Sequence, residues 1–159
     1  AIISGAALLN AAELTGRSME DMKVVFSGAG AAAVACAKLY VSLGVKHENI
    51  VMCDSDGPLN LARADTIEPI KQEFITRRSI ANMTEALVDA DAFVGLSVGN
   101  VLSAEMLQGM APNPIIFAMA NPDPEIPYAE AKAARPDAIV ATGRSDHPNQ
   151  VNNVLGFPF

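Results

Sequence analysis

Residues 23–33 read KVVFSGAGAAA, a short apolar run that passes through a glycine-rich turn into a stretch of small residues. The apolar run predicts a buried strand over 23–27, and the small residues predict a helix over 31–43 that ends at Gly44. The turn between them has the pattern G-x-G-x-x-A. A turn of this kind between a strand and a helix is typical of dinucleotide-binding loops.

Each small residue of this turn has a physical reason to be small. Gly28 permits the tight turn, Gly30 lets main-chain N–H groups approach a pyrophosphate, and Ala33 allows the helix to pack closely on the strand. The N-terminus of the following helix favours negative charge. The candidate cofactor-binding loop therefore consists of Gly28, Ala29, Gly30, Ala31, Ala32 and Ala33.

An acidic residue follows the next predicted strand, which covers 49–53. Asp54 comes after Gly30 at close to the spacing of about 20 residues that separates the glycine loop from a ribose-binding acid. Asp54 could bind both hydroxyls of an adenosine ribose, or it could only cap a turn. Asp54 and Asp56 would repel a 2′-phosphate, which slightly favours NAD over NADP. Arg63 or Lys71 could nevertheless bind such a phosphate, so NADP remains an alternative.

Strands and helices alternate along the rest of the chain. Further apolar strands are expected over 92–97, 114–119 and 138–142, and further helices over 1–14, 84–89, 103–110 and 128–134, with 67–78 as a possible additional helix. Continuous apolar strands indicate a parallel sheet that is covered on both faces. The sequence predicts an α/β, doubly wound (Rossmann-type), mostly parallel sheet of about five strands with helices on both faces. No boundary interrupts it, so residues 1–159 are expected to form a single domain.

Small and polar residues follow every predicted strand, and ligands of such sheets bind beyond the carboxyl ends of the strands. Ser97 and Asn121 are candidates for contact with the cofactor. Asn121 precedes a proline, so it could either start a turn or direct its amide at a nicotinamide or a substrate. Beyond the last strand, residues 149–153 carry four carboxamides, which can hydrogen-bond a ligand without adding charge.

Composition limits the classes of function. The chain has 159 residues, 50% of them hydrophobic, and a net charge of −7 with no basic cluster, which argues against nucleic acid as a partner. No apolar stretch has transmembrane length and none resembles a signal peptide, so we expect a cytoplasmic protein without membrane contact. Cys36 and Cys53 are expected to be buried, reduced thiols. The first helix begins in mid-pattern without an initiator Met, and we expect the chain to come from a longer protein.

Four segments resemble malic enzymes, and in particular the bacterial kind. They are Ser-Gly-Ala-Gly-Ala-Ala at 27–32, Ala-Asn-Pro-Asp-Pro-Glu at 120–125, Ala-Thr-Gly-Arg-Ser-Asp at 141–146 and Pro-Asn-Gln-Val-Asn-Asn-Val-Leu at 148–155. The opening AIISGAALLN is similar to the helix that enters the NAD(P)-binding domain of that family. The resemblance covers essentially the whole chain, and its last motif is the most specific.

The resemblance implies an activity and roles for individual residues. The family oxidises malate and decarboxylates it to pyruvate and CO₂, with NAD or NADP and a divalent Mg or Mn ion. By motif, residues 28–31 hold the pyrophosphate and Asp54 the adenosine ribose. Asn121 contacts the nicotinamide ribose near malate, Asn153 contacts malate, and Asn152 lies close to the cofactor.

The family also requires a catalytic Tyr, a catalytic Lys and three acidic metal ligands, which precede the segment that corresponds to this chain. The resemblance therefore implies no catalytic and no metal-binding residue here, an inactive isolated chain, and the remainder of a malic enzyme chain as its partner, in a parent that is a homo-oligomer. Residues 58–62 depart from the aromatic and glycine of the family pattern, which leaves the choice of cofactor open. The alternatives are a non-catalytic NAD(P)-binding or assembly module, or a domain of another Rossmann dehydrogenase.

Overall fold

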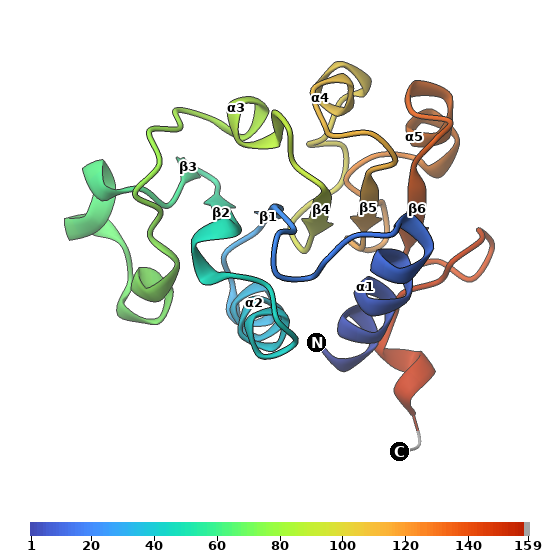
Figure 1. The fold of residues 1–159 in the computed structure, drawn as a ribbon, viewed down its shortest axis with the longest axis horizontal. Helices are drawn as coiled ribbons and strands as arrows, with labels where there is room; N and C mark the ends of the chain where they lie inside the picture. Colours follow the sequence, from blue (N-terminus) through green and yellow to red (C-terminus); the bar gives the residue numbers. More distant parts are fainter. Residues whose placement is uncertain (158–159) are drawn as a thin grey trace.

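A computed structural model describes residues 1–157 and shows one six-stranded sheet in the order β3-β2-β1-β4-β5-β6 (Figure 1). The strands are β1 Val24–Ser27, β2 Ile50–Asp54, β3 Gly57–Pro58, β4 Ala92–Gly95, β5 Ile115–Ala118 and β6 Ile139–Thr142. The helices are α1 Ile2–Thr15, α2 Ala31–Ser42, α3 Met83–Leu87, α4 Ala104–Gln108 and α5 Tyr128–Ala134, with short 3₁₀ turns η1 His47–Asn49, η2 Leu61–Thr66, η3 Pro69–Phe74 and η4 Asn153–Gly156.

The predicted doubly wound sheet is confirmed. The five predicted strands are all present and pair in parallel, with β1 at the centre between β2 and β4. Strands β2 and β3 lie on one side of β1, and β4, β5 and β6 lie on the other. The strand order therefore reverses between β1 and β4, and ligands of such sheets bind beyond the carboxyl ends of the strands at this point. The sixth strand, β3, was missed. It runs antiparallel to β2 because only Ser55 and Asp56 separate the two strands, and so short a connection permits only a hairpin.

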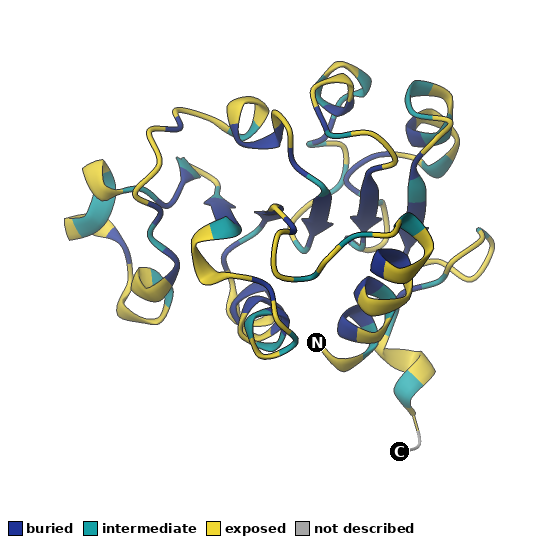
Figure 2. Ribbon diagram, in the orientation of Figure 1, coloured by how far each residue is buried: buried dark blue, intermediate teal, exposed yellow. Residues whose placement is uncertain are grey.

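Helices cover both faces of the sheet, with α1 and α2 on one side and α3, α4 and α5 on the other (Figure 1). Alternate strand residues supply two separate cores: Phe26 packs with α1 and α2, whereas Val25 packs on the opposite face. Four of the five parallel strands have at least four consecutive buried residues, and the sheet is the most deeply buried layer (Figure 2). Burial on both faces explains why these strands read as continuous apolar runs.

The region after β3 differs from the prediction of one helix over 67–78. Only the 3₁₀ turn Pro69–Phe74 forms there, and the chain then becomes extended. The Thr76 N–H donates to the Leu59 carbonyl at 2.8 Å, and Ile67 and Phe74 are buried. Pairing with the segment after β3 and burial of these two side chains outweigh the local helical pattern, which Pro69 also weakens.

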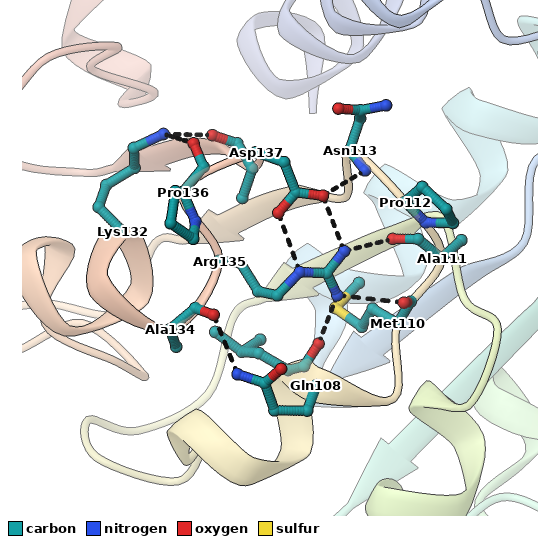
Figure 3. Close-up of polar contacts among 12 residues, drawn as sticks. Gln108, Met110, Ala111, Pro112, Asn113, Lys132, Ala134, Arg135, Pro136 and Asp137 are labelled. Atoms are coloured by element: carbon teal, nitrogen blue, oxygen red, sulfur yellow. Dashed lines mark hydrogen bonds and ion pairs between the residues drawn. The ribbon is translucent and has the colours of Figure 1, made fainter.

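Arg135 ties α4 to α5 at the amino edge of the sheet (Figure 3). Its guanidinium donates to the carbonyls of Leu107 at 2.7 Å, Met110 at 3.1 Å and Ala111 at 2.9 Å, and it pairs with Asp137 through two bonds. It thereby adds a donor to the Leu107 carbonyl, which already accepts from the Met110 N–H, and it pairs two carbonyls of the segment just after α4. The hydrogen bond from Arg135 holds the pKa of Asp137 far below its usual range, so the pair stays ionised.

Both cysteines are buried free thiols, as predicted. Burial is the main reason that the pKa of Cys53 rises to about 12, with a further contribution from the Asp54 charge. The Cys53 thiol is therefore protonated and unreactive at neutral pH. No helix in residues 1–157 combines the length and the apolar character that crossing a membrane requires.

Candidate functional site

The glycine loop leaves β1 in a conformation that only glycine adopts easily. Gly28 has φ = 111°, and a Cβ at this position would lie 2.6 Å from the Leu96 carbonyl oxygen. The Gly28 N–H donates to the Cys53 carbonyl at 2.8 Å. The loop is therefore packed against the ends of both β2 and β4, which places its main chain at the carboxyl edge of the sheet.

The second glycine of the loop faces open space. A Cβ at Gly30 would meet no described atom within 4 Å, although Gly30 has ordinary extended dihedrals of φ = −78° and ψ = 179°. Gly30 is the N-cap of α2, and the first turn of this helix carries no acidic side chain. The free N–H groups of a helix N-terminus and the space in front of Gly30 fit the pyrophosphate of a dinucleotide.

Asp54 ends β2 and is held by Arg63. The Arg63 guanidinium donates to Asp54 Oδ2 at 2.8 Å and to the carbonyls of Gly57 and Pro58 at 3.0 and 3.1 Å. The Asp56 N–H donates to Asp54 Oδ1 at 2.9 Å. Arg63 therefore fixes the β2–β3 hairpin and places its positive charge directly beside the predicted ribose-binding carboxylate.

The ionisation of Asp54 follows from these contacts. Partial burial alone would raise the pKa of Asp54, but the hydrogen bonds from Arg63 and Asp56 and the charges of Arg63 and Lys71 outweigh it. The net effect lowers the pKa of Asp54, which is therefore a carboxylate at neutral pH. Its oxygens can accept hydrogen bonds from ribose hydroxyls.

Ser97 lies two residues after the end of β4, beside the end of β1. Its hydroxyl is 2.9 Å from the Ser27 hydroxyl, which belongs to the last residue of β1. Its N–H donates to Glu125 Oε1 at 3.0 Å, and its hydroxyl lies 3.4 Å from the same oxygen. Ser97 thus connects the glycine loop to a buried carboxylate that comes from the segment after β5.

Glu125 was not predicted as a site residue. Its side chain is fully buried, and Oε2 accepts a hydrogen bond from the Ala120 N–H at 3.0 Å. A Cβ at Gly95 would lie 2.2 Å from the Glu125 carboxyl carbon, so the carboxyl group occupies the space that the absent side chain leaves. Glu125 lies within the quoted motif at 120–125, but no spacing rule connects it to Gly95 or Ser97.

Asn121 and Asn152 meet at Gly143, just beyond β6. The Asn152 amide donates to the Gly143 carbonyl at 3.0 Å, and its Oδ1 accepts from the Val154 N–H at 3.0 Å. The Asn121 carboxamide lies over Gly143, where a Cβ would be 3.1 Å from its nitrogen. The ends of β5 and β6 therefore bring the two amides to the same place. Asn152 also caps η4, so it shapes the loop in addition to any ligand contact.

A cleft of about 1060 Å³ opens beside these amides. Asn121, Asn152 and Asn153 line it, together with Ala32 of the glycine loop and the first residues of α1. Asn153 is exposed at the start of η4. The other predicted site residues, Gly28 to Ala31, Ala33, Asp54 and Ser97, do not line this cleft; they lie at the ends of β1, β2 and β4 along the same edge of the sheet.

The remaining two carboxamides of the cluster build the turn. Asn149, with φ = 60°, donates from its side chain to the Val140 carbonyl at 3.0 Å. Gln150 forms an isolated parallel bridge with Thr142. Among residues 1–157, no three His, Cys, Asp or Glu side chains gather into a group that could hold a metal ion.

Comparison with known proteins identifies the family. The family model for "Malic enzyme, NAD binding domain" matches residues 1–159. The chain is 51% identical to the NADP-dependent malic enzyme of Haemophilus influenzae and 48% identical to the NAD-dependent malic enzyme of Rhizobium meliloti. These alignments cover 100% and 99% of this chain but only 21% and 20% of the two relatives, so the chain spans about a fifth of their length.

A solved structure extends this similarity to three dimensions. The crystal structure of the NAD-dependent malic enzyme from Thermotoga maritima matches with a TM-score of 0.90 and 42% identity, over 99% of this chain and 42% of the other. Family model, sequence identity and fold agree over essentially the same residues. The chain belongs to the malic enzyme family, and it is the NAD(P)-binding domain of such an enzyme.

Proposed function

We propose that the carboxyl edge of the sheet binds NAD or NADP. The open space in front of Gly30, at the N-terminus of α2, is the observation that supports this proposal most directly. In this arrangement residues 28–33 cradle the pyrophosphate, the Asp54 carboxylate accepts hydrogen bonds from the adenosine ribose, and Ser97 borders the cofactor in the crevice. Residues 1–159 act as one cofactor-binding domain within a longer polypeptide.

The nicotinamide half and the substrate belong, on this proposal, in the cleft beside the amide cluster. Asn121 contacts the nicotinamide ribose and malate, Asn152 the cofactor, and Asn153 malate. When bound there, NAD or NADP would supply the hydride acceptor for the oxidation of malate, and the longer protein would release pyruvate and CO₂. Carboxamides suit this position because they donate to a carboxylate or a carbonyl without placing a charge beside the ring that accepts the hydride.

The choice between NAD and NADP depends on Asp54 and its neighbours. An ionised carboxylate repels a 2′-phosphate, and for this reason we favour NAD slightly. Arg63 reduces that repulsion by its direct contact with Asp54. Relatives named after either cofactor match this chain. Measured affinities for both dinucleotides are therefore part of the test below.

The rest of the reaction requires groups outside this chain. The proton-transfer Tyr and Lys, and the acidic ligands of a Mg or Mn ion, come from the remainder of the malic enzyme chain, which we propose to assemble as a homo-oligomer in the cytoplasm. No described cluster in residues 1–157 fits such an ion. We therefore expect the isolated chain to bind dinucleotide and to show no turnover of malate.

Replacing Gly30 with leucine tests the cofactor site. The new side chain would enter the space assigned to the pyrophosphate, and we expect at least a tenfold weaker affinity, about 1.4 kcal/mol, for NAD and NADP by titration calorimetry. The urea midpoint of unfolding should remain close to that of the unmodified chain, because no described atom lies within 4 Å of the added Cβ. Unchanged affinity in the variant, or no binding by the unmodified chain at millimolar dinucleotide, would contradict the proposal.

Replacing Asn153 with alanine in the longer protein tests the substrate end. We expect a higher malate KM or a lower kcat, by about tenfold, since an amide that donates to a charged substrate contributes about 1.5 kcal/mol or more. Asn10→Ala is the matched control, because Asn10 is an exposed amide in α1 that does not line the cleft. Equal kinetics for the two variants would reduce Asn153 to a residue of the loop.

A further inference from the structure

Glu125 is a buried carboxylate without a cationic partner. It is 0% exposed, and among the ion pairs of residues 1–157 none includes it. Burying a charge is unfavourable unless hydrogen bonds replace the lost water. The hydrogen bonds that replace it come from the main chain of Ser97 and Ala120 and from the Ser97 hydroxyl.

The donors to Glu125 lie on two different segments, one that follows β4 and one that follows β5. Ser97 is the second residue after β4, and Ala120 directly precedes Asn121 in the segment after β5. The two carboxylate oxygens accept separately, Oε1 from the Ser97 N–H and Oε2 from the Ala120 N–H, each at 3.0 Å. One side chain therefore sets the distance between the segment that carries Ser97 and the segment that carries Asn121.

The main chain reinforces the same connection. The Asn100 N–H donates to the Pro124 carbonyl and the Leu102 N–H to the Glu125 carbonyl, both at 3.0 Å. On the other side, the Ser97 hydroxyl reaches the Ser27 hydroxyl at 2.9 Å, one residue before Gly28. A continuous set of hydrogen bonds thus runs from the glycine loop through Ser97 and Glu125 to the residue before Asn121.

We infer that Glu125 is a positioning residue, which holds the cofactor-binding loop after β4 and Asn121 in register with the glycine loop. This inference rests on the proposed function, because it assigns Ser97 and Asn121 to the cofactor and the substrate. A carboxylate is required, since both oxygens must accept hydrogen bonds from N–H groups that point at them. A carboxamide offers only one such acceptor, and its NH₂ group would face one of the two donors.

The test uses Glu125→Gln in the full-length protein. We expect kcat/KM for malate to fall at least tenfold and the dissociation constants of NAD and NADP to rise severalfold, at a temperature where circular dichroism shows a folded protein. Arg135→Ala is the control, because Arg135 stabilises the other end of the sheet, where the strands begin. It should lower the melting temperature without changing these kinetic and binding constants.

Two results would overturn the inference. If Glu125→Gln lowers the melting temperature as Arg135→Ala does but leaves kcat, KM and the dissociation constants unchanged, Glu125 only stabilises the fold. If Glu125→Gln does not fold, Ser27→Ala tests the other end of the same connection. It removes a hydroxyl with no assigned ligand contact, and it should raise the dinucleotide dissociation constants severalfold; unchanged constants would contradict the inference.

The failure of the proposed reaction can be told apart from the failure of this inference. If the unmodified full-length protein binds dinucleotide but does not oxidise malate, the proposed substrate is wrong. The dinucleotide dissociation constants of Glu125→Gln, Ser27→Ala and the Arg135→Ala control then still decide the role of Glu125.

Discussion

Gly28→Ala is expected to lower the free energy of unfolding by about 3 kcal/mol or more. The positive φ of 111° disfavours every side chain, by roughly 1–2 kcal/mol. In addition, the new Cβ would lie 2.6 Å from the Leu96 carbonyl oxygen and 2.9 Å from its carbon. These are main-chain atoms at the end of β4, which cannot move aside as a flexible side chain would, and such overpacking costs about 1–3 kcal/mol more.

Gly16→Ala provides a matched control for this prediction. Gly16 also has a positive φ, 68°, but a Cβ there would meet nothing within 4 Å. It should show only the conformational cost of about 1–2 kcal/mol. Urea unfolding of both variants, followed by circular dichroism, separates backbone strain from the clash with β4. Equal losses of stability would mean that the glycine loop does not pack against Leu96 as the structure shows.

Gly95→Ala is expected to have an effect of similar size through a different mechanism. The added Cβ would lie 2.2 Å from the Glu125 carboxyl carbon and 2.5 Å from both oxygens, so the carboxylate must leave its position. The Ser97 and Ala120 N–H groups would lose their acceptor, and each buried donor left unpaired costs about 1–3 kcal/mol. We expect a loss of about 3 kcal/mol or more in the free energy of unfolding.

A double-mutant cycle checks the cause. Once Glu125→Ala has removed the carboxylate, Gly95→Ala should cost far less, so the two changes together should be less destabilising than their sum by more than about 1 kcal/mol. Gly109→Ala is the control for an added methyl group, because its nearest described neighbours are at 3.7 and 3.8 Å. If the two losses add within about 0.5 kcal/mol, Gly95 and Glu125 do not compete for the same space.

Most of the fold could be predicted because its signals are local. The five parallel strands are continuous apolar runs that end at small or polar residues, and each formed within about two residues of the predicted range. The failures lie where partners are distant in the sequence. The segment 67–78 has a helical pattern, but Thr76 pairs with Leu59, and the two residues of β3 are too short to leave a pattern.

In the candidate site, too, the residues that could be predicted are those with a local signal in the sequence. Gly28, Gly30 and Asn121 follow strands, so their placement at one edge follows from the parallel order of the sheet. The contact of Arg63 with Asp54 and the role of Glu125 could not be predicted, because both depend on which atoms these side chains meet. Arg63 reaches Asp54 across a hairpin that was not predicted, and Glu125 fills the space above Gly95, which belongs to another strand.

The sequence by itself determined the five parallel strands and the glycine turn, because strand burial and turn geometry depend on neighbouring residues. It also carried the motifs that resemble malic enzymes. Only the tertiary structure decided how the segments that follow the strands are held together. The contacts of Ser97 with Ser27 and Glu125 join residues 70 and 28 positions apart. A buried carboxylate is stable only where the tertiary structure brings hydrogen-bond donors to it. These donors come from distant residues, so no local sequence pattern predicts them.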